Sequence, residues 1–62
     1  SLWHAKYFPL VLAALAAVAE EEGDYAAARE HLERGAAVYR RLGAIAEAEH
    51  AEGRLRLLEP PK

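Results

Sequence analysis

The fold of this 62-residue chain is decided by the stretch Gly23-Asp24-Tyr25-Ala26-Ala27-Ala28-Arg29-Glu30-His31-Leu32. Gly23 follows a long apolar run, and a glycine at such a place ends a helix in the left-handed conformation. Asp24 is a good N-cap, because its carboxylate accepts hydrogen bonds from the first free N–H groups of the next helix. A link of two residues forces the two helices to lie antiparallel. The stretch therefore predicts a helical hairpin.

The second helix of this hairpin carries one apolar stripe. Its members follow spacings of three and four residues, as in the seam of a packed helix pair: Tyr25, Ala28, Leu32, Gly35, Tyr39 and Leu42. We expect Tyr25 and Tyr39 to be core anchors. Gly35 costs about 1 kcal/mol relative to alanine, which predicts a close approach of the two backbones. Charged residues, including Glu30 and Arg34 at i,i+4, lie mostly off the stripe.

The first helix is apolar on every side. No polar residue occurs from Leu10 to Ala19, and a helix of that kind is buried on most sides. Two short helices cannot surround it, so we expect a further surface from a second copy, another repeat or a target peptide. The run ends in Glu20-Glu21-Glu22, three acids at the unfavourable end of the helix dipole. We expect an arginine to pair with them, with three candidates: Arg29, Arg54 and Arg56.

Proline sets the expected start of the hairpin. Pro9 disfavours helical geometry in Phe8 and suits the first turn of a helix, which predicts a boundary or kink between them. We therefore divide the single small domain into a short N-terminal segment or helix (1–8), a hairpin (9–42) and a third helix (44–58).

The third helix is expected to pack through its own stripe of small and apolar residues: Ala44, Ala48, Ala51, Leu55 and Leu58. Gly43 separates it from the second helix, and Pro60-Pro61 stop it. Glu52 and Arg56 form another i,i+4 pair. The chain thus predicts an all-α fold, an antiparallel hairpin followed by a third, capping helix.

Composition excludes several classes of function. The chain has no cysteine, so disulfides, thiol catalysis and cysteine-ligated zinc are excluded. A formal net charge of -2, with both signs interspersed, gives no electrostatic footprint for nucleic acid or anionic lipid. Asparagine, glutamine, threonine and methionine are also missing. The lack of thermolabile side chains indicates a thermophilic source, with a GC-rich genome or a designed helical chain as alternatives.

The apolar segment has the outline of a secretion signal. It follows Lys6 and ends in Ala17-Val18-Ala19, the small-x-small form of a signal-peptidase site. Its removal would delete the most hydrophobic third of a core that is marginal at this chain length. A membrane span needs about 20 apolar residues, against 13 from Tyr7 to Ala19. We therefore interpret it as a buried helix of a cytoplasmic protein without membrane contact. Because the chain begins at Ser1, we expect a piece of a longer protein rather than a trimmed initiator methionine.

With these residues in place, the chain resembles the tetratricopeptide repeat family. The repeat is a 34-residue helical hairpin with large apolar, small, glycine and tyrosine positions in a fixed order. The matching positions lie in residues 9–42: Leu12, Leu15, Ala16, Ala19, Gly23, Tyr25, Ala28, Leu32 and Gly35. Gly35 replaces the last alanine of the pattern, which implies tighter packing than usual. After Gly43 the chain departs from the pattern, with Glu49 and His50 where leucine and a small residue belong, and resembles a capping helix.

The resemblance implies right-handed superhelical packing and protein binding in a concave groove lined mainly by the first helix of each hairpin. The groove positions that it implies here are Leu10, Ala13, Ala14 and Ala17. Without a Lys/Arg clamp for a carboxylate, such a groove favours another helix over a charged peptide tail. An aromatic cluster must also dock on this chain or a neighbour: Trp3, Tyr7 and Phe8. We therefore predict a protein-interaction and self-association module, which binds a second copy or an amphipathic helix of another protein.

Two alternatives stay open. The first is a helical-repeat segment of a larger bacterial regulatory or scaffold protein. The second is a small helical metal or acid–base enzyme, in which Glu47 and His50 have the ExxH spacing of ferritin-like diiron sites and the 20–22 acids are partners. That pattern requires two such motifs, and only one occurs. The sequence also has no nucleophile elbow, phosphate loop or serine–histidine arrangement. We therefore predict no enzymatic activity, no metal and no cofactor.

Overall fold

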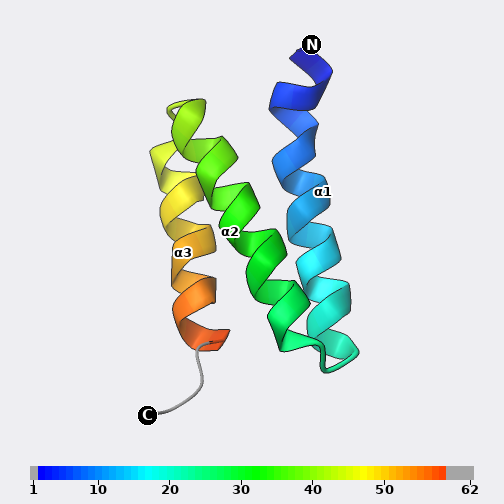
Figure 1. Ribbon diagram of the computed structural model, residues 1–62. Helices are drawn as coiled ribbons and strands as arrows, with labels where there is room; N and C mark the ends of the chain where they lie inside the picture. The colour runs from blue at the N-terminus through cyan, green and yellow to red at the C-terminus, as the bar shows by residue number, and fades with distance from the viewer. Residues whose placement is uncertain (1, 59–62) are drawn as a thin grey trace.

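The described part of the chain folds as three α-helices in a row. A computed structural model describes residues 2–58, with side chains from residue 7 onward. Helix α1 spans Leu2–Glu21, α2 spans Tyr25–Arg41 and α3 spans Ile45–Leu58, and the described part of the chain contains no strand (Figure 1). The predicted all-α fold, with its hairpin and third helix, is confirmed.

The first turn has the predicted geometry. Gly23 has a φ of 79°, the left-handed conformation that glycine adopts without strain. The amide of Gly23 donates to the Glu20 carbonyl at 3.0 Å, and the amide of Asp24 donates to the Ala19 carbonyl at 2.8 Å. The Asp24 carboxylate accepts from the Ala27 amide at 3.1 Å. The end of α1 and the cap of α2 are therefore both as predicted.

The second turn repeats the first. Gly43 has a φ of 78°. Its amide donates to the Arg40 carbonyl at 3.1 Å, and the amide of Ala44 donates to the Tyr39 carbonyl at 2.9 Å. Alanine stands here where the first turn has aspartate, so this turn has no side-chain cap. The same backbone geometry makes α3 fold back along α2 as α2 folds back along α1.

The predicted boundary at Pro9 is wrong. Helix α1 runs from Leu2 to Glu21 through Pro9, so the described part of the predicted 1–8 segment is continuous with the first helix of the hairpin, which begins before residue 9. Proline inside a helix costs about 3 kcal/mol, because it lacks an N–H and crowds the preceding turn. Here the ring of Pro9 is fully buried. The burial of this ring and of the neighbouring turns against α2 offsets that cost.

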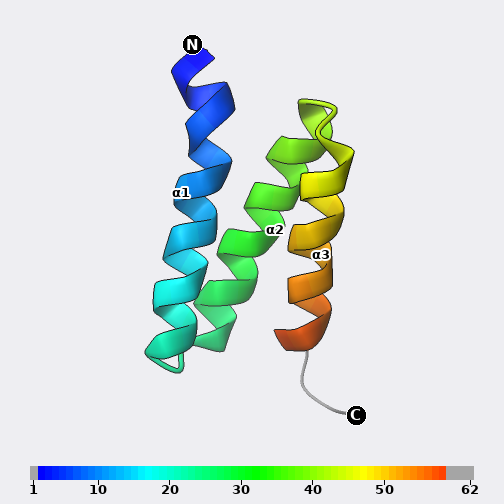
Figure 2. The same ribbon diagram turned by 180° about the vertical axis from the view of Figure 1, so that it is seen from behind.

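The three helices form a single curved layer. Helix α2 lies in the middle and packs against both α1 and α3, and the two views agree on this order (Figures 1 and 2). The extents along the principal axes are 37 × 21 × 12 Å, so the molecule is thin in one direction. Domains usually bury their apolar faces between two or more packed layers. One layer leaves both broad faces of this molecule uncovered.

The core between the helices consists mainly of alanine. Its central cluster joins all three helices, with Leu55 and Leu58 packed against it: Ala16, Leu32, Ala36 and Ala51. Small side chains allow helix axes to approach closely, at the short end of the usual 8–10 Å range. The predicted stripe of α3 is confirmed, because Ala48 and Ala51 are buried and the two leucines are half-buried.

The predicted stripe of α2 is confirmed only in its central part. Ala28, Leu32 and Gly35 are buried, and Tyr39 is half-buried. The ends are exposed, with Tyr25 at 52% and Leu42 at 49%. These positions adjoin the two turns, where the single layer offers no neighbour to cover them. Tyr25 is therefore not the core anchor that was predicted.

Gly35 packs at an ordinary distance. A Cβ atom built on Gly35 would lie 3.7 Å from the Cβ of Leu12 and 3.8 Å from the Pro9 carbonyl oxygen. Both values are normal van der Waals contacts, so the tighter packing expected of this glycine is wrong. Alanine would fit here without movement of α1.

Candidate interaction site

Helix α1 is buried on one side only. Four residues face α2 and are buried: Pro9, Leu12, Ala16 and Ala19. The expectation that the apolar run is buried on most sides is wrong within this chain, because a helix at the edge of a single layer has one neighbour. Its remaining apolar residues fall on two further faces, one on each side of the buried one.

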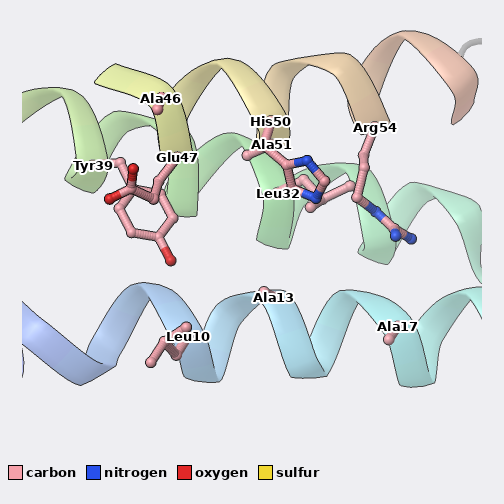
Figure 3. A pocket seen from close by; sticks show the side chains of 10 residues that line it. All are labelled: Leu10, Ala13, Ala17, Leu32, Tyr39, Ala46, Glu47, His50, Ala51 and Arg54. Carbon is pink, nitrogen blue, oxygen red and sulfur yellow. The ribbon is translucent and has the colours of Figure 1, made fainter. Parts of the chain in front are cut away.

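The first of these faces lines a groove. Leu10, Ala13 and Ala17 line it from α1 (Figure 3). The hollow between the three helices has a volume of about 390 Å³. The other lining residues come from α2 and α3: Leu32, Tyr39, Ala46, Glu47, His50, Ala51 and Arg54. The Tyr39 hydroxyl points across the groove toward α1 (Figure 3). The groove is thus apolar on its α1 wall and partly polar on its α3 wall.

An ion pair crosses one end of the groove. Arg54 of α3 bonds through its guanidinium to the carboxylate of Glu20, in the last turn of α1. Of the three arginines expected to pair with the acidic end of α1, Arg54 is the one that does so. Glu21 and Glu22 are exposed and make no ion pair within the described residues.

A second ion pair joins α2 to α3. Arg40 donates to both carboxylate oxygens of Glu52, with Nε–Oε2 and Nη2–Oε1 distances of 2.7 and 2.6 Å. This two-pronged hydrogen bond raises the pKa of Arg40 and lowers the pKa of Glu52. Glu52 therefore bonds across to α2, while its predicted partner Arg56 adds only a longer-range attraction. The predicted Glu30–Arg34 pair is present at 3.9 Å.

The other free face of α1 is a stripe of large apolar side chains, which we call the outer stripe: Phe8, Val11, Leu15 and Val18. They are 41%, 46%, 45% and 53% exposed. Their spacing is three, four and three residues, which places them in one line along a helix of 3.6 residues per turn. On the same helical wheel they lie roughly opposite Leu10, Ala13 and Ala17, with the buried face between the two sets. Large contiguous patches of exposed apolar surface are typical of interaction sites.

The predicted partner-binding residues do not form one surface. Leu10, Ala13 and Ala17 gather in the groove, whereas Ala14 is exposed outside the groove lining. Phe8 belongs to the outer stripe, and Tyr7 is 41% exposed beside it. The side chain of Trp3 lies outside the described part of the structure.

Sequence reasoning missed three members of the outer stripe: Val11, Leu15 and Val18. Their three-four spacing was present in the sequence. The spacing did not distinguish one face of the helix from another, because every residue between 10 and 19 is apolar. Only the position of α2 separates a buried face from exposed ones.

The described residues of the metal or acid–base hypothesis do not assemble a metal site. Glu47 and His50 both line the groove. Within the described residues, no three histidine, cysteine, aspartate or glutamate side chains are close enough to hold a metal ion. Among the side chains that the structure describes, Glu47 and His50 have no third ligand to complete a site.

Comparisons with protein-family models, with curated proteins and with solved structures find no match to this chain. Its interactions are therefore inferred from its own surfaces. Over the described residues, none of the helices combines the length and the apolar character needed to cross a membrane.

Proposed function

We propose that this chain is a non-enzymatic protein-interaction and self-association module, which buries its apolar first helix against another polypeptide. One observation carries the proposal: the four side chains of the outer stripe are each about half exposed on the most apolar helix of the chain. Full burial of such a side chain is worth about 1.5–3 kcal/mol. Covering the exposed halves would contribute on the order of 4 kcal/mol per subunit, before the entropic cost of association.

The shape of the molecule supports the same proposal. A single layer of three helices has no second layer to cover its broad faces, and 62 residues bury only about 60% of the surface of the unfolded chain. A second polypeptide on α1 would supply the missing layer. The resemblance to tetratricopeptide repeats agrees with this proposal, since that family binds proteins and stacks helical hairpins side by side.

Size-exclusion chromatography with light scattering at micromolar concentration tests the proposal. We expect a particle larger than the 6.8 kDa of one chain, with a mass that falls on dilution. A monomer at every concentration that unfolds cooperatively would contradict self-association. It would show that the single layer is stable with α1 uncovered.

A second candidate is a segment of helical repeats in a larger bacterial regulatory or scaffold protein. The two turns at Gly23 and Gly43 share one backbone geometry, as expected where similar helical units follow one another. In that case a neighbouring helix of the same polypeptide would cover the outer stripe. A chain extended upstream distinguishes this candidate from self-association. The repeat candidate predicts a monomer in which a Val18→Cys thiol reacts slowly with a maleimide, because a neighbouring helix covers it. Self-association predicts an oligomer.

A further inference from the structure

The spacing of the outer stripe, three, four and three residues, is the same from either end of α1. Phe8, Val11, Leu15 and Val18 alternate as the a and d positions of a heptad repeat. When two such helices run antiparallel, each a position meets a d position. Phe8 then lies opposite the partner's Val18, and Val11 lies opposite the partner's Leu15. Every layer pairs a larger side chain with a valine, so the layers have similar volumes.

A parallel pair would pack less evenly. Phe8 would meet the partner's Phe8 at one end, and Val18 would meet the partner's Val18 at the other. The layers would differ in volume by several methylene groups, which favours gaps or overpacking. Self-complementary packing about a two-fold axis is also the commonest symmetry of protein dimers.

Charge separates the two orientations more strongly. The stripe is followed by Glu20-Glu21-Glu22, of which only Glu20 has an ion-pair partner in the described residues. A parallel pair would place two such acidic ends side by side, with mutual repulsion. An antiparallel pair places each acidic end beside the N-terminal end of the partner's α1, where the helix dipole is positive and the sequence has Lys6.

We propose that the outer stripe binds a second copy of this chain, as an antiparallel two-fold pair of α1 helices whose acidic ends meet the partner's helix N-termini. This inference rests on the proposed function, because it names the partner and the orientation of the self-association. The groove lies on the other side of α1 and stays open in the pair. The dimer therefore presents two grooves, one on each subunit.

Distances between spin labels test the orientation of the two helices. Because the chain has no native cysteine, each introduced cysteine is the only site that is labelled. Glu21→Cys places a label at the C-terminal end of α1, and Ala14→Cys places a matched label beside the middle of the stripe. The rise along an α-helix is about 1.5 Å per residue. In an antiparallel pair, residue 21 of one subunit therefore lies roughly 24 Å from residue 21 of the other subunit, measured along the helix axis. The two copies of residue 14 are only about 3 Å apart along the same axis. We therefore expect a long distance for Glu21→Cys and a short one for Ala14→Cys, with light scattering of both labelled proteins as a control for dimer formation.

Each other outcome overturns the inference in a distinct way. Short distances from both labels would show a parallel pair, and the proposed function would stand. A dimer with a long distance from Ala14→Cys would show association through another surface. A monomer by light scattering, with no distance between subunits, would overturn both the inference and the proposed self-association.

Discussion

The two sides of α1 use apolar residues of different size. The buried face holds Ala16 and Ala19, with Leu12 and Pro9 as its larger members. The outer stripe holds phenylalanine, leucine and two valines, all about half exposed. The helices of one chain thus pack closely through small side chains, while the larger apolar side chains remain available outside. In the proposed function, the inner face stabilises the fold of one chain and the outer stripe binds a second copy.

The outer stripe is the side on which a charge should have the largest effect. Leu15→Lys places an ammonium group in the middle of the proposed interface, where its burial is unfavourable. We expect the dissociation constant of the dimer to rise by on the order of 100-fold or more, as measured by light scattering over a dilution series. Leu57→Lys is the matched control, because Leu57 is 84% exposed on α3. Equal effects of the two variants on the dissociation constant would contradict the placement of the interface at the outer stripe.

The buried face should reject a larger side chain. Ala16 is 1% exposed at the junction of all three helices. Ala16→Leu should lower the free energy of unfolding by about 1–3 kcal/mol through overpacking, whereas Ala14→Leu, on an exposed turn of the same helix, should change it little. Thermal unfolding at one fixed protein concentration measures both. If Ala16→Leu left the free energy of unfolding unchanged, the alanines of the buried face would not be needed for close packing of the helices.

The Asp24 cap starts α2 at the turn by which α2 folds back along α1. Asp24→Ala removes the hydrogen bond to the Ala27 amide. We expect a loss of about 1 kcal/mol in the free energy of unfolding, with dimer formation retained once the protein is folded. Denaturant titration measures the first and light scattering the second. Asp24→Asn, which also caps well, should recover most of the loss.

Gly35 tests how tightly the buried face is packed. Since an added Cβ would meet only ordinary contacts, at 3.7 and 3.8 Å, Gly35→Ala should raise the free energy of unfolding by about 0.5–1 kcal/mol. Denaturant titration measures this gain as a shift of the unfolding midpoint to a higher denaturant concentration. Destabilisation would instead show that α1 and α2 approach more closely at this point than the contacts indicate.

The smallest expected effect is a pH dependence at the α2–α3 contact, away from both faces of α1. The hydrogen bond from Arg40 lowers the pKa of Glu52 below its usual value. Its stabilisation is therefore fully present above the unfolded pKa of about 4.3 and is lost as the pH falls through the lower folded value. Glu52→Gln should unfold more easily than the wild type at pH 7, and this difference should shrink below about pH 4. If the difference in unfolding free energy between Glu52→Gln and the wild type stayed constant from pH 7 to below about pH 4, the Arg40–Glu52 ion pair would not be its source.

The sequence predicted the elements of the fold well because their ends are marked locally. Glycine at positions 23 and 43 and the Asp24 cap determine the turns through the geometry of a few bonds. Pro9 was misjudged, because its local preference for a helix start is weaker than the burial of its ring against α2. The resemblance to tetratricopeptide repeats and the thermophilic origin stay predictions.

The candidate site was predictable only in part. Leu10, Ala13 and Ala17 were expected in a groove, and they line one. The outer stripe was not found, because an all-apolar helix has no polar residues to mark its faces. Which face is free depends on the number of layers in the fold, and that number is a property of the whole chain.

The most direct test of the outer stripe as a self-association surface is the labelling rate of a single thiol placed on it. Val18→Cys is the only thiol in its chain, and the native side chain is 53% exposed in one subunit. We expect its reaction with a maleimide to slow as protein concentration rises, while Leu57→Cys reacts at a constant rate. A Val18→Cys rate that is equally independent of concentration would contradict the burial of the outer stripe by a second copy.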